Sequence, residues 1–265
     1  MRTPIRYHLG VAALLAVALA ACNGGSSIPV GSTAGSSGAV TTQDAPAPGQ
    51  VPISANAVPD GVQPNGLSPI VTEPGDVYGA TDKFTPHYGD ASHGGRGQVV
   101  DGVTCTPHMV TNLYHVHVYL GIVHNGRQIA LPYAIGMVGS APPENGYVNI
   151  AKCYYHIHTH DSSGIVHLEV DKNLPLTDEL YRLKNVLDIW GIPRSTSQFG
   201  PFKGPIHVFV GNVPQIGQTV VSQYAEYKGS MDDIRLKSHE VIWIEIGDKY
   251  YTASQLPSVN FYMEY

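Results

Sequence analysis

The sequence predicts an α+β fold, in which a mixed or antiparallel sheet is built from two β-hairpins and two C-terminal strands, with one helix packed on one face. Two segments alternate polar and apolar residues on either side of turn residues, which is typical of β-hairpins. One further segment has apolar residues at helical spacing, and two strongly apolar segments follow it. The order hairpin, hairpin, helix, strand, strand indicates a β-grasp-like arrangement.

The more informative hairpin spans residues 153–170 and contains four of the chain's 13 histidines. A turn of two or four residues in its Asp-Ser-Ser-Gly segment places His158 opposite His167. In the same register, His156 lies opposite Glu169. Successive side chains alternate across a strand, so the intervening residues share the other face; these are Tyr155, Ile157, Thr159, Val166, Leu168 and Val170. One face is therefore apolar, and the other carries imidazoles and a carboxylate.

The other hairpin spans residues 114–135 and turns at Asn125-Gly126, a strong signal for a two-residue hairpin turn. This turn places His115 and His117 on one face, opposite small residues that leave room for imidazole rings. The small residues are Gly136, Ala134 and Pro132, and the apolar face pairs Val116, Val118, Leu120 and Ile122 with Ile135, Tyr133, Leu131 and Ile129. Both hairpins thus separate an apolar face from a histidine-bearing face.

The helix is expected over residues 177–190, with Thr177 as its N-cap and Gly191 ending it. Its apolar stripe, formed by Leu180, Leu183, Val186, Leu187 and Trp190, is expected to pack on the apolar faces of the hairpins. Residues 206–210 and 240–246 are predicted strands, and the nearly continuous apolar run of the second favours a central position.

The first 21 residues are typical of an export signal, since a basic start precedes a short apolar core and small residues. The following Leu-Ala-Ala-Cys sequence resembles the bacterial lipobox, which implies cleavage before Cys22 and lipidation of its sulfur. Asn23 after the lipidated cysteine favours the outer membrane, with the domain facing the periplasm. The alternative is an ordinary signal peptide followed by a coincidental cysteine.

Residues 22–76 are rich in Gly, Ser, Ala and Pro and have few charged or aromatic residues, so we expect a disordered tether. Residues 77–265 are then a single globular, histidine-rich domain. The formal net charge of −6, without a Lys/Arg-rich segment, argues against nucleic acid as a partner. The expected partner is the lipid membrane, through acylated Cys22.

Two cysteines remain beyond the lipidation site, Cys105 and Cys153. Each lies shortly before a histidine-bearing strand, and an even number of cysteines in an exported protein predicts a disulfide. The alternative is ligation of a metal ion by a thiolate, for example by Cys153 together with His156.

Several histidines on one sheet face repel one another as they become charged near pH 6.5, so this pattern needs a physical reason. An H-x-H pair on one strand with a third histidine on its neighbour is the geometry of many zinc sites, and neutral imidazole also suits copper. We therefore predict a transition-metal site for copper or zinc. The predicted ligands are His117, His158 and His167, with His115, His156 and His160 as alternates.

Two other functions remain open at this point. A metalloenzyme of hydrolase, lyase or oxygenase type would use three histidines, or two histidines and a carboxylate, with Glu169 or Asp161 as its base. Asp161 is equally explained as the first residue of the turn. A structural or interaction module without metal would instead hydrogen-bond each imidazole to the backbone or to a carboxylate.

The chain also resembles a group of uncharacterised bacterial secreted proteins and lipoproteins over roughly residues 95–250. The resemblance is carried by Asp101-Gly102-Val103-x-Cys105, His115-x-His117, Cys153-Tyr-x-x-x-His158-Thr159-His160-Asp161-x-Ser163-Gly164-x-x-His167-x-Glu169, Asp188-Ile189-Trp190-Gly191 and Leu236-x-x-His239-Glu240. It implies export and a shared role for the histidine motifs, and it implies no particular activity.

Overall fold

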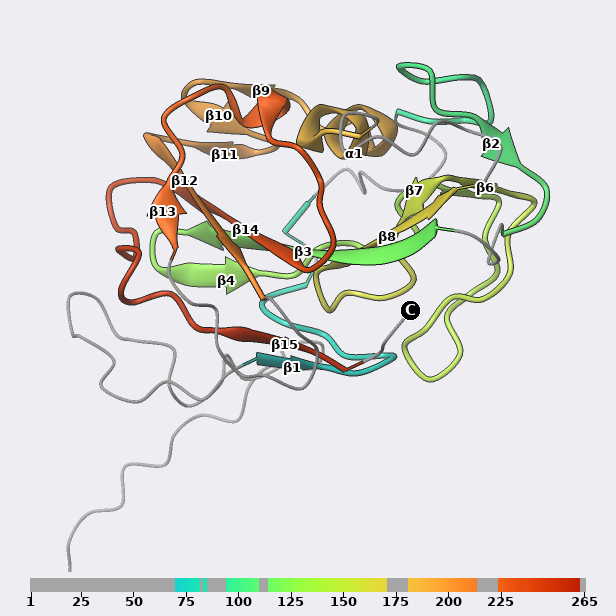
Figure 1. Ribbon diagram of the computed structural model, residues 1–265, viewed down its shortest axis with the longest axis horizontal. Coiled ribbons are helices and arrows are strands. Elements are labelled where there is room, and N and C mark those ends of the chain that lie inside the picture. Colours follow the sequence, from blue (N-terminus) through green and yellow to red (C-terminus); the bar gives the residue numbers. More distant parts are fainter. Residues whose placement is uncertain are drawn as a thin grey trace, which may run out of the picture. The chain divides into compact units, whose positions relative to one another are not determined.

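The computed structural model describes residues 70–81, 83–84, 94–109, 114–170, 181–213 and 224–262. These residues form strands in several sheets and one α-helix, so the predicted α+β class is confirmed (Figure 1). The expected signal peptide, the lipidation site Cys22 and most of the expected tether lie outside the described residues. Within the described ranges, no helix combines the length and the apolar character that crossing a membrane requires.

The largest sheet has the strand order β13-β12-β14-β3-β8-β7, and the short strand β4 also pairs with β3. Its strands are β13 (Ala225–Glu226), β12 (Ile206–Asn212), β14 (Glu240–Ile246), β3 (Tyr114–His124), β8 (Ile165–Val170), β7 (Ile157–His158) and β4 (Arg127–Ile129). The strands β14 and β3 are parallel, and the other pairs are antiparallel. The sheet is therefore mixed, and the first long strand that the structure describes lies beside the last.

Smaller sheets and one 3₁₀ helix complete the fold. The strands are β1 (Ile70–Thr72) with β15 (Val259–Phe261); β2 (Cys105–Thr106), β6 (Cys153–Tyr155) and β5 (Met137–Val138); and β9 (Arg194–Ser195), β10 (Gln198–Phe199) and β11 (Phe202–Lys203). The 3₁₀ helix is η1 (Met231–Asp233). Figure 1 shows α1 and the β1–β15 pair on opposite sides of the large sheet.

The two faces of the large sheet have different partners. The helix α1 (Leu183–Trp190) packs on the face formed by residues such as Val118 and Leu168, in the main hydrophobic core. The opposite face packs around Trp243 against the β1–β15 pair. The histidines of β3, β8 and β7 alternate with the residues of the main core, so they lie on this second face, beyond the area that β1 and β15 cover.

The helix is shorter than expected from its apolar stripe. It begins at Leu183, because Arg182 has an extended backbone with φ −121° and ψ 164°. The expected N-cap Thr177 lies outside the described residues. At the other end, Gly191 adopts the left-handed conformation with φ 75°, and its N–H is bonded to Leu187 and Asp188. The glycine therefore ends the helix as expected.

The expected hairpin over residues 114–135 is correct only near its turn. Ile122 pairs with Ile129 as predicted, but β4 ends there and Tyr133 is exposed. The reason is that β8 occupies the same edge of β3 from Tyr119 to Tyr114. The small residues expected opposite His115 and His117 are therefore replaced by residues of β8.

The folded part of the chain begins before residue 77. Strand β1, which falls in the last part of the expected tether, pairs in parallel with β15. Ile70 and Thr72 are buried in this pair, and Val71 between them is exposed. A three-residue strand with one buried apolar side chain gives little periodic signal in a Gly/Pro-rich segment, so the sequence does not predict β1.

The predicted disulfide is present between Cys105 and Cys153, whose Cα atoms are 5.5 Å apart. The two cysteines lie in the neighbouring strands β2 and β6, each of which precedes a histidine-bearing strand in the sequence. The disulfide excludes Cys153 as a thiolate ligand and ties β2 to the chain that enters β7.

Candidate metal centre

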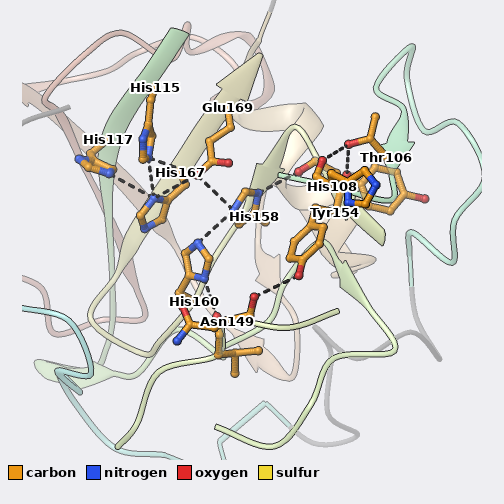
Figure 2. Close-up of polar contacts among 12 residues, drawn as sticks. Thr106, His108, His115, His117, Asn149, Tyr154, His158, His160, His167 and Glu169 are labelled. Carbon is orange, nitrogen blue, oxygen red and sulfur yellow. Dashed lines mark hydrogen bonds and ion pairs between the residues drawn. The ribbon is translucent and has the colours of Figure 1, made fainter. Parts of the chain in front are cut away.

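Three histidines form a row across three adjacent strands. His117 of β3 pairs with His167 of β8, and His167 pairs with His158 of β7. The second pairing is the register predicted from the turn of the 153–170 hairpin. Directly paired residues bring their side chains together on one face, so the three rings share the centre shown in Figure 2.

Three more side chains join this row. His115 pairs with Glu169 two residues along the β3–β8 ladder, on the same face, and His160 follows β7 after one intervening residue. The side chains then form two groups, and within each group the possible ligand atoms lie within 4.8 Å of one another. The first group is His115, His117 and His167, and the second is His158, His160 and Glu169. The structure therefore contains two buried groups of side chains that could hold a metal ion.

In the first group, three ring nitrogens converge. His167 Nδ1 lies 3.1 Å from His115 Nε2 and 3.1 Å from His117 Nε2. A ring nitrogen carries one proton or one lone pair, so His167 Nδ1 can form a linear hydrogen bond with one of these partners. A metal ion bound by tetrahedral nitrogens at 2.0–2.1 Å would separate them by about 3.3 Å, close to the observed spacing.

In the second group, the outer nitrogens are held by backbone carbonyls. His158 Nδ1 donates to Tyr155 O at 2.8 Å, and His160 Nδ1 donates to Val148 O at 2.5 Å. Since a carbonyl oxygen only accepts hydrogen bonds, both Nδ1 atoms carry the proton. In the neutral rings, both Nε2 atoms therefore present lone pairs, and they face each other at 3.2 Å.

Burial controls the charge of this centre. Burial lowers the pKa of His115, holds the pKa of His158 and His167 well below 6.5, and lowers that of His160 to about 4. The neighbouring imidazoles lower the pKa of His158, His160 and His167 further. Burial also raises the pKa of Glu169 to about 7. At neutral pH the three buried rings are therefore neutral and keep lone pairs for a cation.

The connection between β7 and β8 is fixed by side-chain hydrogen bonds. Asp161 accepts hydrogen bonds from the backbone N–H and hydroxyl of Ser163 and from the N–H of Gly75. Thr159, between the two histidines of the second group, accepts from Ile135 N and donates to Pro132 O. Asp161 thus acts as a turn residue, which is one of the two roles expected from the sequence. The hydrogen bonds of Asp161 and Thr159 together position His158 and His160.

Close backbone approach also fixes β7. Gly136 has φ 73°, and a Cβ at this position would lie 2.3 Å from Ile157 O and 3.2 Å from His158 Cβ. A larger residue would therefore displace the strand that carries His158.

One predicted alternate ligand lies outside both groups. The backbone of His156 pairs with Glu169 as predicted, with Glu169 N donating to His156 O at 2.8 Å. Its ring instead contacts Tyr181 and Thr104, at 3.1 and 3.4 Å. The chain bends at this residue between β6 and β7, which belong to different sheets, so the alternation expected for a continuous strand is interrupted.

A pocket of about 330 Å³, including its open mouth, leads from solvent to the first group. Its walls include both His117 and His167, together with Thr72, Glu73, Pro74, Tyr147, Asp161, Ser163, Ile165, Phe261 and Tyr262. Sequence reasoning missed Tyr147, whose ring stacks on His160 with centroids 4.6 Å apart, and Thr72 of β1. No local pattern marks these residues, because they reach the centre only through tertiary contacts.

Comparison of the chain with known protein families, with curated proteins and with solved structures gives no match.

Proposed function

We propose that this chain is an exported lipoprotein that binds a transition-metal ion, copper or zinc, through the histidines on its sheet face. The observation that carries this proposal is the 3.2 Å contact between His158 Nε2 and His160 Nε2, both of which present lone pairs. Two lone pairs that face each other repel, and a cation between them reverses the sign of the interaction.

The geometry of this contact suits a metal ion. An ion 2.0–2.1 Å from both nitrogens would subtend an angle of about 103°, close to the tetrahedral value of about 109°. The backbone hydrogen bonds to the two Nδ1 atoms hold the rings in the tautomer that a ligand needs. A structural module without metal would satisfy the outer nitrogens in the same way but would leave the facing Nε2 pair unexplained.

The donor set favours copper or zinc. Imidazole suits both ions, and copper stands at the top of the affinity order for divalent metals with nitrogen ligands. Hard oxygen-seeking ions such as Mg²⁺ and Ca²⁺ are disfavoured, because one carboxylate is present among five imidazoles in the two groups.

Metal binding is tested on the full chain, purified in detergent with its disulfide intact and stripped with EDTA. The stripped protein is dialysed against Cu, Zn, Ni or Fe, and bound metal is measured by elemental analysis. We expect copper or zinc to be retained by the wild type and to be clearly reduced in His158→Ala. The matched control is His108→Ala, because His108 is exposed and outside both groups. A wild type that retains no metal contradicts the proposal.

Export and lipidation are supported by the lipobox-like sequence before Cys22 and by the disulfide, a type of bond that is rare in reducing compartments. Cys22→Ser is expected to abolish lipidation and release the protein from the membrane fraction. Membrane association that is unchanged in Cys22→Ser would contradict the lipid anchor.

The pocket favours a second candidate function, a metalloenzyme of hydrolase, lyase or oxygenase type. Catalytic metal sites keep one coordination position open, and the pocket gives small molecules access to His117 and His167. Asp161 lines the pocket and Glu169 lies among the ring nitrogens, so both candidate bases would be near an ion bound by the histidines. Metal-dependent turnover of a panel of esters, or metal-dependent oxygen consumption, would favour this function over stoichiometric binding.

A further inference from the structure

The histidine cluster has more donors than one ion can use. Five imidazoles and one carboxylate lie in two groups, whereas a tetrahedral ion takes four ligands. We propose that the cluster holds two transition-metal ions, one in each group, and that the Glu169 carboxylate bridges them. This inference rests on the proposed metal binding and adds the number of ions and the way in which they are connected.

The position of Glu169 supports the bridge. Its Oε1 lies 3.3 Å from His115 Nε2 in the first group and 3.7 Å from His158 Nε2 in the second. The same oxygen lies 4.0 Å from His167 Nδ1. One carboxylate oxygen is therefore placed between the nitrogens of both groups, and the β3–β8 pairing with His115 holds it there.

The second carboxylate oxygen supports the same conclusion. Glu169 Oε2 is buried and has no hydrogen-bond partner among the residues that the structure describes. A buried carboxylate oxygen without a partner is costly, and a second cation would supply one. A carboxylate that bridges two cations uses its charge for both, and carboxylate-containing two-metal sites hold their ions about 3.5–4 Å apart.

The two ions would have different surroundings. The pocket is lined by His117 and His167, so the ion of the first group is accessible to small ligands from solvent. His158, His160 and Glu169 are each at most 3% exposed, so the ion of the second group is enclosed. The first ion is therefore expected to exchange faster with a chelator than the second.

The test counts ions in the full chain, stripped and reloaded with Cu(II). We expect two ions per chain in the wild type. Each of the single variants His115→Ala and His160→Ala is expected to bind one ion per chain. His115 lies at the edge of the cluster and is partly exposed, so this variant is the less disruptive of the two. His160→Gln provides a second, milder variant of the other group. The matched control His108→Ala is expected to keep two ions, and circular dichroism checks that each variant is folded.

Electron paramagnetic resonance tests the bridge. Two Cu(II) ions that share a carboxylate are magnetically coupled, so the doubly loaded wild type should give a weakened or split signal. His115→Ala and His160→Ala should give the ordinary signal of an isolated Cu(II) ion, and Glu169→Gln should weaken the exchange coupling between the two ions.

The outcomes separate this inference from the proposed function. One ion per chain in the wild type, lost in both His115→Ala and His160→Ala, would overturn the two-ion centre while leaving metal binding in place. Two ions without magnetic coupling would overturn the bridge. A wild type without bound metal would overturn metal binding itself, and the two-ion centre with it.

Discussion

A buried carboxyl group in the central strand should make the stability of this protein depend strongly on pH. Glu245 of β14 is fully buried, and burial raises its pKa from 4.5 to about 8. The folded protein therefore keeps the proton of Glu245 in a pH range where the unfolded chain releases it. The stabilisation from this group is fully present below pH 4.5 and is lost as pH rises through 8.

The size of this effect on the free energy of unfolding follows from the rise in the pKa of Glu245. Each pKa unit corresponds to about 1.4 kcal/mol, so the whole shift is about 5 kcal/mol, of which about 4 kcal/mol falls between pH 5 and pH 9. Glu245→Gln has a neutral side chain of similar size and lacks this dependence. The free energy of unfolding of the variant should therefore rise relative to that of the wild type by about 4 kcal/mol from pH 5 to pH 9.

The assay is urea unfolding of the metal-free full chain in EDTA at a series of pH values, followed by tryptophan fluorescence. The chain's two tryptophans, Trp190 and Trp243, are both buried and report on the two faces of the sheet. Other titrating groups are common to both proteins, so they cancel in the difference. The control is Glu144→Gln at an exposed position. A difference between Glu245→Gln and wild type that stays constant from pH 5 to pH 9 would refute the reasoning.

Three further changes test the framework around the centre. Replacing Cys105 and Cys153 by serine opens a loop of 48 residues and should lower the free energy of unfolding by about 4 kcal/mol, measured in urea against the oxidised wild type. Gly121→Ala should cost about 1–3 kcal/mol, because its Cβ would lie 2.3 Å from the Trp243 ring, and an unchanged urea midpoint would contradict this packing. Thr159→Val removes a hydroxyl with two hydrogen bonds and should cost about 1–3 kcal/mol and weaken metal retention, whereas Thr159→Ser should preserve both.

The pairing inside the 153–170 hairpin could be predicted from sequence. The alternation of polar and apolar residues on both sides of one turn allows few registers, and a slip by one residue would move the histidines to the apolar face. The pairing of His158 with His167 and the burial of Ile157 and Leu168 in the main core follow from this constraint. The central position of β14 could be predicted for a similar reason, because residues 241–244 form a continuous apolar run that places apolar side chains on both faces.

The pairing between distant segments could not be predicted in the same way. Each hairpin was expected to carry histidines on one face, but the sequence contains no local signal that β8 pairs with β3, whose His117 lies 50 residues before His167. It also gives no signal for the bend at His156, which removes that ring from the centre, because this bend depends on β6 joining another sheet.

The sequence by itself determined which residues alternate, where the chain turns and which faces are polar, because these features depend on the two-residue period of a strand and on turn chemistry. The tertiary structure decided that His115 and His117 lie beside Glu169 and His167, and that β1 and β15 close one side of the pocket. The physical reason is that a strand edge accepts any compatible partner, and the choice among partners depends on the packing of the whole chain. The joining of five histidines and one carboxylate into a single centre is therefore a property of the folded sheet.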